Sequence, residues 1–124
     1  MLQKRFKFCV ALVLVMLCLC VFNVGTASAK WRNFSFVNYS GKIISYLYIS
    51  RVGYNKWGDD ILGSSVLGQG DSHPCRYNDS YRYFDVKVVF SDGRDAVFSG
   101  HDFRSLWRLT IFQRNSGGYT IRSN

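Results

Sequence analysis

The chain has 124 residues, of which 16 are Lys or Arg and 8 are acidic, so its formal net charge is +8 at pH 7. All eight acidic residues are Asp, and the lack of Glu argues against helices, because Glu often fills exposed helix faces whereas Asp favours turns and caps. This length indicates a single domain, and the composition argues against a helical bundle.

The N-terminal residues have the pattern of an export signal. Lys4, Arg5 and Lys7 give a positively charged start, and an apolar run over residues 8–22 follows it. Ala27-Ser28-Ala29 is the small-x-small pattern that a signal peptidase cleaves. The apolar run is shorter than the roughly 18 to 20 residues that a membrane-spanning helix needs.

These features predict a signal helix within residues 1–29, cleaved after Ala29, and a single domain over residues 30–124. We therefore expect a secreted or periplasmic protein with no stable membrane span after cleavage. The alternative is that the segment is retained as an N-terminal membrane anchor, which the absence of a basic stop-transfer flank disfavours.

The predicted exported part carries 13 Lys and Arg against 8 Asp, and it holds 18 aromatic residues. Aromatic side chains suit pleated surfaces, so this composition favours β structure. Three of the four cysteines lie in the signal segment, which leaves Cys75 alone and permits no internal disulfide. Its polar surroundings favour an exposed thiol that could bridge two chains through an intermolecular disulfide. The alternative is a buried, inert thiol.

The first two predicted strands cover residues 31–39 and 42–51, and residues 38–41 form the turn between them. The first strand alternates around Phe34 and Phe36. Strict alternation in the second strand places Ile43, Ser45, Leu47 and Ile49 on one face and Ile44, Tyr46, Tyr48 and Ser50 on the other.

Residues 52–76 form a different kind of segment, with five glycines, three Asp and the only proline. Residues 59–62 are predicted to form one helical turn capped by Asp, and residues 65–67 a short strand. A long ordered loop region in a compact domain is often where function resides.

The remaining strands are predicted over residues 81–90, 95–99, 106–113 and 119–122. Asp92-Gly93 between the first two of these strands is a strong hairpin pattern, and residues 100–105 and 115–118 are predicted loops. Two sets of inward-facing residues follow from the alternation: Phe84, Val86, Val88 and Phe90, and Trp107, Leu109 and Ile111. The pattern predicts an all-β fold, a small antiparallel β-sandwich of six to eight strands, with a barrel as the alternative.

Four segments carry a resemblance to a known family: residues 47–50, 57–63, 67–70 and 83–93. In order and spacing they resemble a family of small exported bacterial β-domain proteins, most of them uncharacterised. That family has a Trp-Gly-x-Asp loop and an Asp-x-x-x-x-Phe-x-Asp-Gly hairpin. The resemblance covers residues 34–112 and implies a compact exported β domain. It also implies that a family cysteine pair is replaced here by Arg82 and Arg104.

The sequence offers little support for catalysis. His101 and Asp102 could form part of a hydrolase relay with Ser99 or Ser105, but no nucleophile-elbow pattern accompanies them. Cys75 and the histidines lack zinc-site spacing. We therefore predict no catalytic residue, no metal site, no cofactor and no enzymatic activity.

The charged residues bear on two further partners, calcium and nucleic acid. Calcium prefers oxygen ligands, which Asp residues around the glycine-rich segment and the hairpin could supply, but these Asp also suit turns and caps. Nucleic acid is not expected as a partner, because the basic residues are scattered and export separates the chain from most nucleic acid.

Aromatic residues near the glycine-rich segment give the sharpest hypothesis of a binding site. Exposed Tyr and Trp rings are large amphipathic surfaces on which sugars can stack, and the alternative is that they form a second core layer. The candidate binding residues are Tyr46, Tyr48, Tyr54, Trp57, Asp59 and Asp60. We predict a non-enzymatic protein that binds or scaffolds an extracellular or envelope ligand, with a carbohydrate- or calcium-binding module as the alternative.

Overall fold

The computed structural model describes residues 30–124, and the predicted signal helix lies outside them. The described part contains seven strands and no helix, and therefore no helix that could cross a membrane. The strands are β1 (Trp31–Tyr39), β2 (Ile44–Arg51), β3 (Ser72–Asn78), β4 (Tyr83–Phe90), β5 (Asp95–Asp102), β6 (Arg108–Gln113) and β7 (Tyr119–Ser123).

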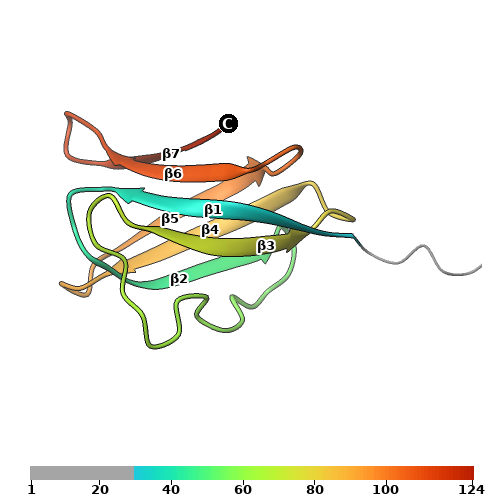
Figure 1. The fold of residues 1–124 in the computed structure, drawn as a ribbon, viewed down its shortest axis with the longest axis horizontal. Coiled ribbons are helices and arrows are strands. Elements are labelled where there is room, and N and C mark those ends of the chain that lie inside the picture. The colour runs from blue at the N-terminus through green and yellow to red at the C-terminus, as the bar shows by residue number, and fades with distance from the viewer. Residues whose placement is uncertain (1–29) are drawn as a thin grey trace, which may run out of the picture.

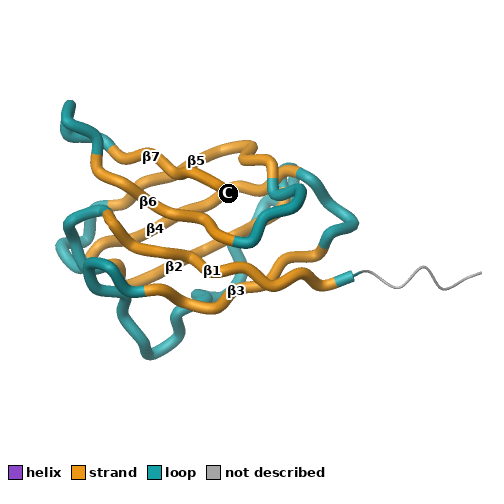
Figure 2. Tube along the Cα trace, turned by 45° about the horizontal axis from the view of Figure 1, so that its top comes forward, coloured by secondary structure: helices purple, strands orange, loops and turns teal. Residues whose placement is uncertain are grey.

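The strands form two packed sheets, with the order β3-β1-β6-β7 in one and β2-β4-β5 in the other (Figure 1). All pairings are antiparallel except that of β1 with β6, which is parallel. The prediction of a small β-sandwich is confirmed, with this one parallel pair as an addition. Figure 2 shows β2 and β3 along one side of the sandwich and β5 and β7 along the other.

The core lies between the sheets and follows the period-two pattern of the strands. Phe84, Val86, Val88 and Phe90 are all buried, as the alternation in β4 predicts. Phe36 of β1 and the β6 pair Leu109 and Ile111 face them from the other sheet. Part of the core is an aromatic cluster, in which edge and stacked contacts join Phe34, Tyr77, Phe84 and Phe103.

The strict alternation predicted for β2 is wrong. A register shift lies between Ile44 and Tyr46, so Ile44 and Leu47 are both fully buried although they are three residues apart. A β-bulge inserts one residue into a strand and changes which side chains face the core. Ile43 and Tyr46 are consequently exposed.

The strand β3 falls mostly within the segment that the sequence predicts as loop. Pro74 lies in its middle, and proline usually argues against a central strand. β3 is an edge strand that pairs only with β1, and proline is tolerated at such an edge. The missed strand is thus explained by its position in the sheet.

Four local predictions also need correction. Residues 59–62 form no helical turn, and in residues 65–67 only Leu67 makes a strand contact, an isolated bridge to Ile44. β5 continues to Asp102, past its predicted end. Trp107 precedes β6 and is 56% exposed, so it does not point inward.

Cys75 is buried in β3, which makes the predicted exposure of its thiol wrong. Burial raises the pKa of the thiol to about 12, so the reactive thiolate is suppressed. The intermolecular disulfide through Cys75 stays a prediction, and it would require β3 to leave its packed position.

Candidate binding groove

The loop over residues 52–71 is anchored to the edge of β2, which fixes the shape of this side of the sandwich. The Asp60 carboxylate accepts hydrogen bonds from the backbone N–H groups of Leu47 and Leu62, at 2.9 and 3.1 Å. The Ile61 N–H donates to the Leu47 carbonyl at 2.8 Å. Leu62 and Leu67 are buried in the core, so the loop is held at both of these points.

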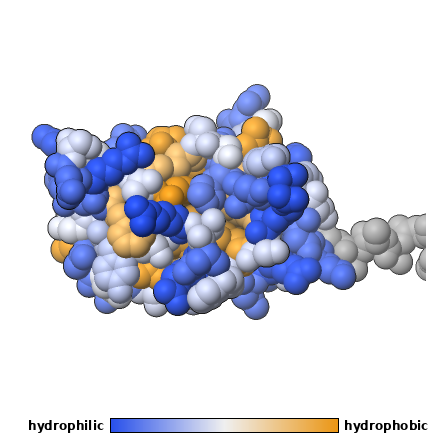
Figure 3. Space-filling model, turned by 90° about the horizontal axis from the view of Figure 1, so that it is seen from above, coloured by the Kyte–Doolittle hydropathy of each residue, from blue (hydrophilic) through white to orange (hydrophobic). Residues whose placement is uncertain are grey.

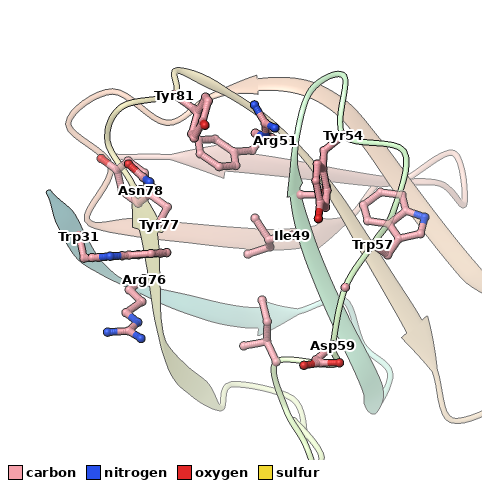
Figure 4. A pocket seen from close by; sticks show the side chains of 14 residues that line it. Trp31, Ile49, Arg51, Tyr54, Trp57, Asp59, Arg76, Tyr77, Asn78 and Tyr81 are labelled. Atoms are coloured by element: carbon pink, nitrogen blue, oxygen red, sulfur yellow. The ribbon is translucent and has the colours of Figure 1, made fainter. Parts of the chain in front are cut away.

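An open groove of about 620 Å³ lies between β2, β3 and this loop (Figure 4). Its lining includes two apolar aliphatic residues, Ile49 and Ile61. The walls are aromatic and charged, and include Trp31, Arg51, Tyr54, Trp57, Asp59, Arg76, Asn78 and Tyr81. The groove thus combines flat ring surfaces with hydrogen-bonding groups, as small-molecule sites commonly do.

Both arginines of the groove lie on aromatic rings. The Arg51 guanidinium is 4.5 Å from the ring centre of Tyr81 and 5.2 Å from that of Tyr54. The Arg76 guanidinium is 4.9 Å from the ring centre of Trp31. Within residues 30–124 neither arginine forms a salt bridge, so neither positive charge is neutralised by a carboxylate.

A second cavity of about 570 Å³ lies on the other side of Tyr77 and Tyr81 and provides a contrast. It too is lined by two arginines, but each has a carboxylate partner. Arg32 pairs with Asp79 at 3.0 Å, and Arg104 pairs with Asp102 at 3.2 Å. The unpaired arginines therefore distinguish the β2–β3 groove from its neighbour.

An aromatic strip on the outer face of the β2-β4-β5 sheet leads into the groove. The rings of Tyr46 and Tyr48 are nearly parallel, with centres 6.4 Å apart, and Trp57 lies 6.5 Å beyond Tyr48. The Lys87 ammonium is 5.9 Å from the ring centres of both Tyr48 and Trp57. Trp57 is shared by the strip and the groove.

The structure brings most of the predicted binding residues to this one region. Tyr46 and Tyr48 lie on the strip, Tyr54 and Asp59 line the groove, and Trp57 joins the two. Tyr46 and Tyr54 are 47% and 53% exposed, so they do not form a second core layer.

Asp60 is not part of the groove lining, because its carboxylate is used by the backbone. The groove residues that the sequence did not reveal are Trp31, Arg51, Arg76 and Tyr81. They come from three strands and one turn, and the pairing of β1 with β3 and the packing of the two sheets bring them together.

His101 and Asp102, the residues considered for catalysis, lie outside the groove and have different surroundings. Asp102 interacts with Arg82 and Arg104, and hydrogen bonds, first from the Arg104 backbone N–H, lower its pKa to about 2. The His101 Nε2 is buried without a hydrogen-bond partner, and burial lowers the pKa of this ring. In the part of the chain that the structure describes, no group of three His, Cys, Asp or Glu side chains could hold a metal ion.

Comparisons of the chain with models of known protein families, with curated proteins and with solved structures find no match. The geometry itself therefore carries the functional argument. What the groove can do is hold a ligand that offers both ring surfaces and polar groups, since it has aromatic faces, arginine donors and an acceptor carboxylate.

Proposed function

We propose that this chain is an exported, non-enzymatic binding protein, and that the β2–β3 groove and the adjoining aromatic strip hold a saccharide of the cell envelope or the surrounding medium. The observation that carries the proposal is the continuity of aromatic rings from the exposed Tyr46 through the half-buried Tyr48 and Trp57 into the groove. Export is supported by the sequence pattern of residues 1–29.

A saccharide fits this surface for two chemical reasons. The face of an aromatic ring carries partial negative charge and attracts the weakly positive C–H groups on the flat side of a sugar ring. The polar groups around the rings, such as Asn78 and Asp59, can exchange hydrogen bonds with sugar hydroxyls. A chain of sugars could extend along the strip, because the ring centres follow one another at 6.4 and 6.5 Å.

The test is a binding titration of the purified exported protein against a panel of soluble bacterial and plant polysaccharides, followed by two tryptophan variants. Trp57→Ala should weaken binding of any active polysaccharide roughly tenfold or more, since central aromatic residues often dominate binding energy. Trp107→Ala is the control, because Trp107 is a tryptophan that is accessible to solvent, more so than the half-buried Trp57, but lies outside the groove and the strip.

The proposal predicts that only Trp57→Ala loses binding while circular dichroism shows both variants folded. It is contradicted if no saccharide binds, or if the two tryptophan variants lose affinity equally.

A further inference from the structure

We infer that the groove recognises an anionic saccharide, whose carboxylate or phosphate oxygens are bound by Arg51 and Arg76. This inference rests on the proposed function and specifies the chemistry of its ligand. Its first support is the pairing of charged side chains among the described residues. Seven of the eight Asp side chains have a hydrogen-bond or ion-pair partner there, and Asp59 is the exception.

Asp59 lines the same groove as the two arginines, yet it forms no salt bridge with either of them. In Figure 4 the Arg51 guanidinium lies between Tyr54 and Tyr81 inside the groove, that of Arg76 lies under Trp31 at the rim, and Asp59 is the one carboxylate in the lining. The positive charge of the lining is therefore only partly offset. A ligand with an acidic group would supply the missing counter-charge. Arg51 differs from the other arginines without a salt bridge in lying against two rings, Tyr54 and Tyr81, within a groove.

Contacts with aromatic rings favour a fixed position for each arginine, from which it could bind an oxyanion. Tyr54 and Tyr81 contact the Arg51 guanidinium, and Trp31 contacts that of Arg76. A ring covers the flat face of a guanidinium and leaves its edge N–H groups free to donate. Those N–H groups form a planar fork that matches a carboxylate or phosphate in a bidentate pair. The rings thus limit the motion of the arginines before a ligand arrives.

An acidic peptide is the main competing occupant, and the strand edges around the groove disfavour it. Extended peptides usually bind by adding a strand to an open sheet edge. The edge of β2 is already occupied by the loop, through hydrogen bonds at Ile44, Leu47 and their partners. The edge strand β3 contains Pro74, which has no N–H to donate.

The experiment is a calorimetric titration of the exported protein with four probes at equal ionic strength. These are an oligogalacturonate, a neutral malto-oligosaccharide of the same length, a phosphorylated malto-oligosaccharide and polyglutamate. We expect the anionic saccharides to bind and the neutral one to bind at least roughly tenfold more weakly, because charge-assisted hydrogen bonds are the strong ones. Whichever anionic saccharide binds more tightly identifies carboxylate or phosphate as the acidic group.

Arginine variants distinguish binding by the groove from nonspecific attraction to the net positive charge of the protein. Arg51→Gln and Arg76→Gln should each weaken binding of the preferred anionic saccharide roughly tenfold, and Arg51→Lys should restore it only partly because lysine lacks the planar fork. Arg108→Gln is the matched control. Arg108 also lies on an aromatic ring, 4.7 Å from the centre of Trp107, and has no salt bridge among residues 30–124, but it lies outside the groove.

Equal binding of the neutral and anionic saccharides, with no effect of Arg51→Gln, overturns the inference and leaves the proposed function intact. Equal losses from Arg108→Gln and Arg51→Gln also overturn it, since binding would then follow net charge alone. Tighter binding of polyglutamate than of any saccharide overturns it in favour of a peptide ligand. If none of the saccharides binds, the inference and the proposed function both fail.

Discussion

The two sheets of the sandwich meet along two edges, and these edges differ: one is closed by packed side chains and the other is open. On the β5–β7 side the strands lie against each other, and Ala96, Phe98, Tyr119 and Ile121 pack onto the core. The Tyr119 ring lies 4.8 Å from that of Phe90. Apolar side chains are visible between hydrophilic ones on the face seen in Figure 3. On the β2–β3 side, charged and aromatic residues surround an open groove instead.

The difference indicates that one side of the domain contributes to stability and the other is available for binding. The closed side adds apolar burial to a fold that has no disulfide among its described residues. The open side places arginines and half-exposed rings where a sandwich needs no further packing, so those residues are available for a ligand. If this is correct, substitutions on the two sides should differ in whether they change stability or binding.

The largest expected effect comes from breaking the core that both sides share. Val88→Asp places an unpaired charge at a fully buried position of β4, which should cost several kcal/mol and unfold the domain. The matched control is Val97→Asp, since Val97 on the neighbouring strand is 50% exposed. Circular dichroism should show a folded control and an unfolded Val88 variant, and a folded Val88→Asp protein would contradict the described register of β4.

A second pair of variants compares the two sides directly. Tyr119→Ala on the closed side should lower the free energy of unfolding by about 2 kcal/mol, because it removes partly buried ring surface and the contact with Phe90. Tyr54→Ala on the open side should lower it by less than about 0.5 kcal/mol, as is usual for exposed positions. Urea denaturation measures both values, and a reversed order would refute the proposed division.

The core and the loop residues of the groove, Tyr54, Trp57 and Asp59, could be predicted from the sequence, whereas the groove residues on the strands could not. Strand β4 and its hairpin follow from local alternation and Asp92-Gly93, which need only short-range information. The groove depends on strand order and register, which place Trp31 beside Asn78. The bulge in β2 and the edge position of Pro74 are likewise properties of the assembled sheets, so a local pattern could not predict them.

A smaller effect is expected from the residue that anchors the loop beside the groove. Asp60→Ala removes the acceptor of two backbone N–H groups and should cost about 1 to 2 kcal/mol. It should also weaken ligand binding, because the loop carrying Trp57 loses its attachment to β2. Asp60→Asn keeps an acceptor oxygen and should be much closer to wild type in both thermal unfolding and binding. Equal losses from both variants would show that the negative charge, not the acceptor, is what matters.

The smallest expected effect concerns the paired arginines next to the groove. The pKa of Asp102 is lowered from 3.8 to about 2, so its favourable interactions contribute stability above pH 3.8 that is lost as the pH falls towards 2. The difference in melting temperature between wild type and Asp102→Asn should therefore shrink over this pH range. A difference that stays constant between pH 5 and pH 2 would show that Asp102 protonation is not linked to stability.

The central claim is that a ligand binds in the β2–β3 groove, and the three tryptophans allow it to be tested in one experiment. Trp31 and Trp57 line the groove, whereas Trp107 lies outside it. In a proton–nitrogen correlation NMR spectrum each indole N–H gives its own peak. Titration with the saccharide that binds should shift the Trp31 and Trp57 indole peaks and leave that of Trp107 in place. Binding that moves the Trp107 peak, while the other two stay unchanged, would contradict the account.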